Sequence, residues 1–228
     1  MEFPRLPERF RNLGLFVLLS SYFILYPLLA TTHVAGPAVQ VLLSLAVLMS
    51  IFAQFSTRRS TRLTLLVVGS LAVVTNWLPA DAGIPDFLPP LAYACFFLFT
   101  VSLFCFKLFT ARDVDADTLF AAGCAYILLG FLFGSLFLMV YKLDPNSIRL
   151  GESGHQPIFE LTYFSFVTLT TLGYGDIVPV SYTAQMLAAY EAIAGQIFMT
   201  VAIAELVGVH VAQKRTAFSS DADAGLER

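Results

Sequence analysis

The chain has 228 residues and a formal net charge of −3; 57% of its residues are hydrophobic and 13% are charged. A soluble domain carries about twice that share of charged residues, so the composition excludes an ordinary soluble domain and indicates a membrane protein. No segment is basic enough to suggest nucleic-acid binding. Cys95, Cys105 and Cys124 lie in apolar stretches, which favours buried free thiols over a disulfide framework or a metal site.

Four apolar runs in the first half of the chain predict membrane-spanning helices. Each is near the length of about 20 residues that crosses a hydrocarbon core of about 30 Å. The runs are residues 13–30, 38–55, 63–78 and 91–109. Arg5, Arg9 and Arg11 precede the first run, so a cleaved secretory signal is the alternative to a retained helix. The run is long for a signal, and we favour the retained helix, with a kink at Pro27.

A charged segment containing Lys107 and Arg112 separates these helices from a fifth apolar run at 119–141. Small residues in the fifth run let membrane helices approach closely, and we expect them to pack on the last helix. They are Gly123, Gly130, Gly134 and Ser135. A polar loop follows at 142–156. The last helix, 181–213, would be about 50 Å long, so it should be tilted or extend into the cytoplasm, and the polar tail after it should be disordered.

Between these two helices, Pro157 can start a helix, and residues 158–169 form about three turns. From Thr168 onward the chain reads Thr-Leu-Thr-Thr-Leu-Gly-Tyr-Gly-Asp. A K⁺ ion leaving water needs oxygens in place of its hydration shell, and successive carbonyls of a short strand supply them when several chains line one axis. Carbonyls that aim the same way require alternate residues in backbone regions that a Cβ disfavours, which Gly173 and Gly175 permit. Gly-Tyr-Gly-Asp alone is also an ordinary turn sequence, but the half-helix before it favours the ion-binding strand.

This stretch resembles the signature filter of potassium channels, and residues 120–213 resemble the two-helix pore module of prokaryotic members of that family. The resemblance, with the helix count, implies an all-α membrane protein: six transmembrane helices per subunit, a re-entrant pore half-helix and a selectivity-filter loop, in a tetrameric ion-channel architecture. It implies that K⁺ is held by filter carbonyls and the Thr171 hydroxyl, with no cofactor besides the permeant ions. The K⁺ ligands would be Thr171, Leu172, Gly173 and Tyr174, with Gly175 completing the ion-binding strand. One filter copy per chain also requires a homotetramer, because one strand cannot encircle an ion.

Residues around the filter are expected to support it. Asp176 closes the motif at the outer mouth and should accept a hydrogen bond from Tyr163, at a position where the family often has an aromatic donor. Thr170 is the third support residue. Val167 stands where some members carry an acid, and Phe164 replaces an aromatic donor, so both of those family hydrogen bonds should be missing.

The last helix carries a candidate hinge and a candidate pore lining. Gly195 falls where the family commonly has its hinge glycine, although glycine also serves packing alone. Residues spaced by three, four and four share one helical face, which would line the inner vestibule or form a packing stripe. They are Gln196, Met199, Ile203 and Val207. Acids inside a membrane default to a functional hypothesis; for Glu191 we favour a protonated group bonded behind the half-helix, and for Glu205 contact with cytoplasmic water.

Basic residues set the orientation. They gather at the N-terminus and near the ends of the second, fourth and last helices, while Lys142 and Arg149 fall on the opposite side. The positive-inside rule then makes both termini cytoplasmic in a multi-pass protein of the cell membrane, with the filter opening outward. The chain divides into a cytoplasmic N-terminus, a four-helix transmembrane domain, a pore domain and a short cytoplasmic tail: 1–12, 13–112, 113–213 and 214–228. A voltage sensor needs Arg or Lys at every third residue of its fourth helix, which here offers only Lys107, and Arg58, Arg59 and Arg62 should lie in a loop.

The sequence therefore predicts a potassium-selective channel that conducts K⁺ passively through a homotetrameric pore, is not strongly voltage-gated and is not an enzyme. Its expected partners are membrane lipid and K⁺, without nucleic acid. A less selective cation channel is one alternative. The membrane subunit of a potassium uptake transporter is another, although such transporters usually carry several degenerate filter-like repeats in one chain.

Overall fold

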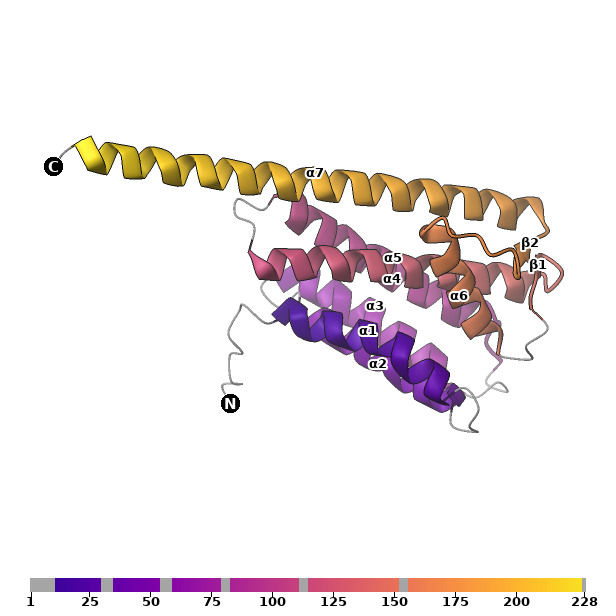
Figure 1. Cartoon of the computed structure of the whole chain (residues 1–228). Coiled ribbons are helices and arrows are strands. Elements are labelled where there is room, and N and C mark those ends of the chain that lie inside the picture. Colours follow the sequence, from indigo (N-terminus) through magenta and orange to yellow (C-terminus); the bar gives the residue numbers. More distant parts are fainter. Residues whose placement is uncertain are drawn as a thin grey trace.

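The computed structural model describes residues 11–29, 35–53, 59–78, 83–110, 115–151 and 156–226. The sequence-based expectations for Arg5, Arg9, Arg58 and Arg112 lie outside these residues. Within them the chain is almost entirely helical, with one two-stranded ladder (Figure 1). The elements are α1 (Arg11–Leu29), α2 (Ala35–Ala53), α3 (Arg59–Trp77), α4 (Leu88–Phe109), α5 (Ala116–Leu143), β1 (Ile148–Arg149), α6 (Pro157–Leu169), β2 (Val178–Pro179) and α7 (Tyr182–Leu226).

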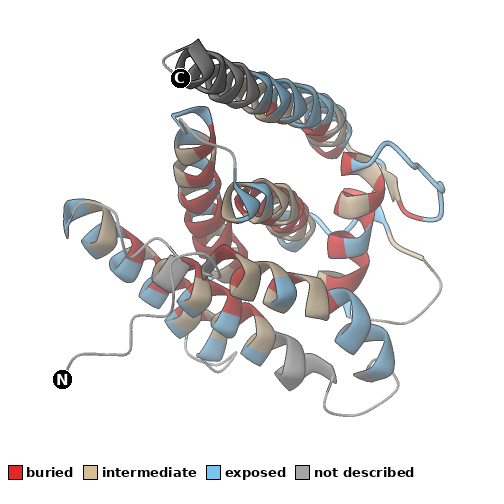
Figure 2. Cartoon of the chain, turned by 60° about the vertical axis from the view of Figure 1, so that its left-hand side comes forward, coloured by how far each residue is buried: buried red, intermediate tan, exposed pale blue. Residues whose placement is uncertain are grey.

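Successive helices from α1 to α5 run in alternating directions (Figure 1). α5 lies at the centre, against α1, α4, α6 and α7. Buried residues concentrate in α4 and α5, whereas α7 is mostly exposed up to Val209 (Figure 2). Three of the described helices are long and apolar enough to cross a membrane: Leu88–Phe109, Ala116–Leu143 and Tyr182–Val209. Shorter apolar helices cover Asn12–Leu25, Gln40–Ile51 and Pro157–Leu169.

Helix starts follow from local sequence. Prolines occupy the first turns of α4 and α6, where a missing N–H costs no hydrogen bond, so α6 begins at Pro157 as expected. Asp115 caps α5 by accepting a hydrogen bond from the backbone N–H of Thr118 at 2.9 Å.

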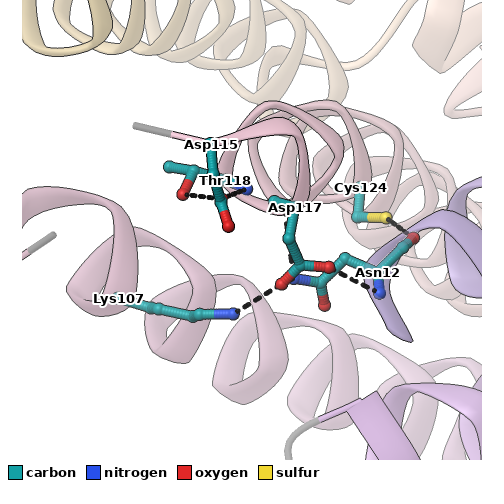
Figure 3. A network of polar contacts seen from close by, with 6 residues as sticks. All are labelled: Asn12, Lys107, Asp115, Asp117, Thr118 and Cys124. Atoms are coloured by element: carbon teal, nitrogen blue, oxygen red, sulfur yellow. Dashed lines mark hydrogen bonds and ion pairs between the residues drawn. The ribbon is translucent and has the colours of Figure 1, made fainter. Parts of the chain in front are cut away.

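A polar network joins α1, α4 and α5 at the end of the bundle opposite the strands (Figure 3). Asp117 Oδ1 accepts the backbone N–H of Asn12 at 3.1 Å, and Asp117 Oδ2 accepts the Asn12 side-chain amide at 2.7 Å. Lys107 Nζ lies 3.4 Å from the same Oδ2, and the Cys124 thiol donates to the carbonyl of Asn12. The carboxylate of α5 thus caps the first turn of α1, whose N–H groups have no partner within their own helix.

Two helix boundaries differ from the predictions by more than three residues. α3 begins at Arg59, so Arg59 and Arg62 lie in its first turn rather than in a loop. Arginine is a good helix former, and a helix continues past the end of its apolar stretch when nothing breaks it. For the same reason α7 continues to Leu226 instead of ending near residue 213 before a disordered tail, because neither Gly nor Pro occurs between Gly208 and Gly225.

The packing partners of the small residues in α5 also differ. A Cβ built at Gly123 would lie 2.8 Å from the Phe16 ring of α1, one at Gly130 would clash with the Phe166 ring of α6, and one at Gly134 would lie 3.2 Å from the backbone of α6. The expectation that these residues pack on the last helix is therefore wrong. Large aromatic side chains from α1 and α6 fill the space that the missing Cβ atoms leave.

Candidate functional site

The predicted filter strand starts at the C-terminal end of α6. The backbone N–H groups of Leu172 and Gly173 both donate to the carbonyl of Val167, at 2.9 and 3.3 Å, and the N–H of Thr171 donates to the carbonyl of Thr168 at 2.9 Å. The start of the strand is thus bound to carbonyls that the helix end leaves without partners. The half-helix fixes where the strand begins.

Alternate residues of this strand have a left-handed backbone. The φ angles are +59° at Thr171, +58° at Gly173 and +81° at Gly175. The alternation agrees with the requirement derived from the sequence, and the two glycines occupy the positions expected of them. Thr171 was not expected, because a residue with a branched Cβ pays about 1–2 kcal/mol for this conformation.

The outer end of the strand is bound to the half-helix through the expected side-chain pair. The Tyr163 hydroxyl donates to Asp176 Oδ2 at 2.9 Å. Phe164 is buried, and its ring packs against Phe137 of α5 with the centroids 4.8 Å apart. The Val167 side chain is buried as well, so the side chains of Phe164 and Val167 contribute packing and no hydrogen bond to the predicted filter strand.

A short ladder that the sequence did not predict anchors the chain beyond the filter. β1 and β2 pair antiparallel, with Ile148 opposite Pro179 and Arg149 opposite Val178. The carbonyl of Ser147 accepts the N–H groups of Val180 and Ser181 at 2.8 and 3.0 Å. Two residues per strand are too few to leave a periodic pattern, so this ladder could not be predicted from the sequence.

Behind the half-helix, Glu191 of α7 is completely buried, as is Ser165 of α6. The Ser165 Oγ lies 2.5 Å from Glu191 Oε1 and 2.7 Å from the carbonyl oxygen of Gly130 in α5. Glu191 therefore bonds behind the half-helix, as expected. One turn further along α7, a Cβ at Gly195 would lie 2.6 Å from the carbonyl oxygen of Leu169, so Gly195 allows α7 to approach the end of α6.

The filter residues make few side-chain contacts within their own chain. Residues 170 to 176 are all exposed, and 56% of Leu172 and 67% of Tyr174 is accessible. Only 11% of the residues in the most apolar stretch of α7 are buried within the chain, against 61% of those in the corresponding stretch of α5. Gln196, Met199, Ile203 and Val207 are exposed too, and Glu205 is half-buried. Within the described residues, no group of three or more His, Cys, Asp or Glu side chains could hold a metal ion.

Residues 124–211 match the family model described as "Ion channel". The chain is 26% identical over 98 residues to "Two-pore potassium channel 2" of Arabidopsis thaliana, which covers 43% of this chain and 21% of that protein. It is 34% identical over 70 residues to "Two-pore potassium channel 1" of the same plant, which covers 30% of this chain and 19% of that protein. The chain thus spans about a fifth of the length of these curated relatives.

The matched residues begin in α5 and end in α7, so they contain the half-helix and the filter strand described above. The pore half of the chain is therefore similar to the ion-channel family, and potassium channels are among the proteins that it resembles.

Proposed function

We propose that this protein is a potassium-selective channel that conducts K⁺ passively. The observation that carries the proposal is the alternation of left-handed residues at Thr171, Gly173 and Gly175, directly after a half-helix. That alternation is what a strand needs to turn successive carbonyls toward one axis. The carbonyls of Thr171 to Tyr174 and the Thr171 hydroxyl would replace the hydration shell of K⁺. The negative dipole end of α6 would face the vestibule and favour a cation there.

The exposed filter and the exposed inner helix support a homotetramer. Leu172 and Tyr174 are large side chains that the single chain leaves uncovered, and one strand cannot surround an ion. Neighbouring copies would cover these side chains and brace the strand from outside. The exposed face of α7 that carries Gln196, Met199, Ile203 and Val207 would line the vestibule below the filter, and Gly195 would be the hinge of α7 or its packing contact.

Six crossings would suit the alternating course of α1 to α5 and α7. Arg59 and Lys107 lie at the end of the bundle away from β1 and β2, whereas Arg149 lies in β1 (Figure 1). By the positive-inside rule this distribution would place both termini in the cytoplasm and the filter mouth outside, in a multi-pass protein of the cell membrane, with the helix past residue 213 on the cytoplasmic side.

Reconstitution in liposomes tests the proposal. Under opposed K⁺ and Na⁺ gradients, the reversal potential should lie close to that of K⁺ without any energy source. A reversal potential near zero would favour a less selective cation channel, and flux that depends on a coupled energy source would favour a transporter subunit.

A substitution in the filter sharpens this test. Gly175→Ala places a Cβ on a residue with φ of +81°, at about 1–2 kcal/mol per subunit, so we expect the preference for K⁺ over Na⁺ to fall by about tenfold. Gly14→Ala in α1, where a Cβ would meet only ordinary contact, is the matched control. Unchanged selectivity in Gly175→Ala would contradict the filter assignment.

A further inference from the structure

Three helices meet at one buried chain of oxygens. The chain runs from the Gly130 carbonyl of α5 through the Ser165 hydroxyl of α6 to the Glu191 carboxyl of α7. Gly130 is buried, and Ser165 and Glu191 have no exposed surface at all. These oxygens lie where the half-helix α6 meets α5 and α7.

The protons of this chain can be counted. Two oxygen–oxygen contacts of 2.7 and 2.5 Å each need one hydrogen between the two atoms. A backbone carbonyl supplies none and a serine hydroxyl supplies one. The second hydrogen must therefore come from Glu191, which supplies one only as a protonated carboxylic acid. Ser165 then donates to Gly130, and Glu191 donates to Ser165.

The surroundings of the carboxyl agree with this count. The other oxygen, Oε2, is buried without a hydrogen-bond partner. Among the described residues, the ion pairs join Lys107 to Asp117 and Lys142 to Asp86, and none involves Glu191. A buried carboxylate with an unbonded oxygen and no cation nearby would be very costly, whereas the neutral acid leaves only one unbonded carbonyl-type oxygen.

We propose that Glu191 is a neutral carboxylic acid whose proton holds α7 in register against the back of the half-helix, so that it acts as a positioning residue for the filter. Only the positioning role rests on the proposed function; the neutral state of Glu191 does not. Gly195, one turn after Glu191, contacts the carbonyl of Leu169, two residues before Thr171. A slip of α7 along α6 would therefore displace the first residues of the filter strand.

Infrared spectroscopy of the purified protein tests the proton without any measurement of conduction. A protonated carboxyl absorbs as a carbonyl stretch that is separate from the bands of a carboxylate. At neutral pH, the difference spectrum between the wild type and Glu191→Gln should show the loss of one such carbonyl stretch. Loss of carboxylate bands alone would overturn the proposal, whatever the protein conducts.

Substitution series test the positioning role. Gln can donate the same hydrogen bond from its amide, so Glu191→Gln should keep K⁺ flux within about twofold of the wild type, whereas Glu191→Leu and Ser165→Ala should reduce it by about tenfold or more. Ser102→Ala is the control for the serine, because Ser102 is exposed and bonds only a carbonyl of its own helix. Loss of flux in Glu191→Gln, or full flux in Glu191→Leu, would contradict the role of the proton.

The two proposals fail differently. If the flux in liposomes proves non-selective while the acid carbonyl stretch is present, the proposed function fails and the protonated Glu191 stands. If flux is selective for K⁺ and the stretch is absent, the reverse holds.

Discussion

At the residue scale, the hydrogen bond from Tyr163 to Asp176 Oδ2 joins the half-helix to the outer end of the filter. Hydrogen bonds to a charged group contribute about 1.5–3 kcal/mol, so Tyr163→Phe should let the filter collapse more readily. We expect conduction by the proposed channel to decline faster during sustained opening and the proposed tetramer to dissociate at a lower temperature. Tyr182→Phe is the control, because that side chain is almost fully exposed. Equal decay in both variants would mean that the bond adds nothing to the filter.

Gly195 offers a second prediction at this scale, because hinge and packing roles give different results. A Cβ there would press on the backbone oxygen of Leu169, which cannot move aside as a flexible side chain would. If packing is its role, Gly195→Ala should destabilise the proposed tetramer by about 1–3 kcal/mol per site. Thermal dissociation followed by native electrophoresis measures this.

The control for this prediction lies on the same helix. Gly208→Ala adds a Cβ where nothing lies within 4 Å, so it should leave the stability unchanged. A hinge alone would instead show altered opening in Gly195→Ala together with unaltered stability.

At the scale of the element, α5 begins at a cap whose strength depends on pH. Hydrogen bonds from the backbone N–H and then the hydroxyl of Thr118 lower the pKa of Asp115 below its ordinary value of 3.8. Because the pKa is lowered in the folded state, the cap stabilises the protein above that ordinary value, and the contribution disappears as the pH falls below it.

Thermal unfolding between about pH 6 and pH 3 measures this contribution. Asp115→Asn keeps a capping oxygen that does not titrate, so its melting temperature should fall less steeply over the acid range than that of the wild type. Parallel curves for the two proteins would show that the cap does not contribute to acid sensitivity.

The elements also show what sequence patterns can and cannot predict. Apolar runs bounded by Pro or by charged residues predicted the helices, and Pro157 predicted the start of the half-helix. The partners of Gly123 and Gly130 could not be predicted, because a small residue shows that something approaches and not what approaches. The end of α7 could not be predicted from the polar residues after residue 213, because polarity does not end a helix. A helix ends where its backbone is interrupted.

The candidate site also contains residues that could be predicted from the sequence and residues that could not. Gly173, Gly175 and the Tyr163–Asp176 pair could be predicted, because the backbone and side-chain chemistry required them. The left-handed Thr171 could not, since its own propensity opposes that conformation and only the surrounding hydrogen bonds impose it. A bond from Glu191 behind the half-helix could be expected, but its partner Ser165 could not, because the two residues lie 26 positions apart in two helices and no local pattern specifies such a pair.

At the scale of the whole molecule, the proposed channel should open with little dependence on voltage. Each full charge that crosses the field is worth about 2.3 kcal/mol per 100 mV, and α4 carries a single basic residue, Lys107. Its charge lies 3.4 Å from Asp117 at the end of the bundle. Arg59 and Arg62, although helical, lie in the first turn of α3 and not along its length.

Recordings of open probability over a range of roughly −100 to +100 mV in symmetric K⁺ measure this dependence. We expect a shallow curve, and Lys107→Gln should leave its slope unchanged. A steep curve, equivalent to several charges per subunit, would show that the first four helices sense voltage after all.

Because α7 is sparsely buried within its own chain, the proposed pore cannot be completed while a single chain is being synthesised. α7 leaves the ribosome after α1 to α6, and the predicted filter strand comes just before it. When the strand emerges, Ser165 still lacks its contact with Glu191 of α7, and the side chains of Leu172 and Tyr174 are uncovered by their own chain. In the proposed tetramer, the conduction path therefore forms only after α1 to α5 are made, and it forms between chains. A chain that stops before α7 would still insert its first helices, and it would never build a pore.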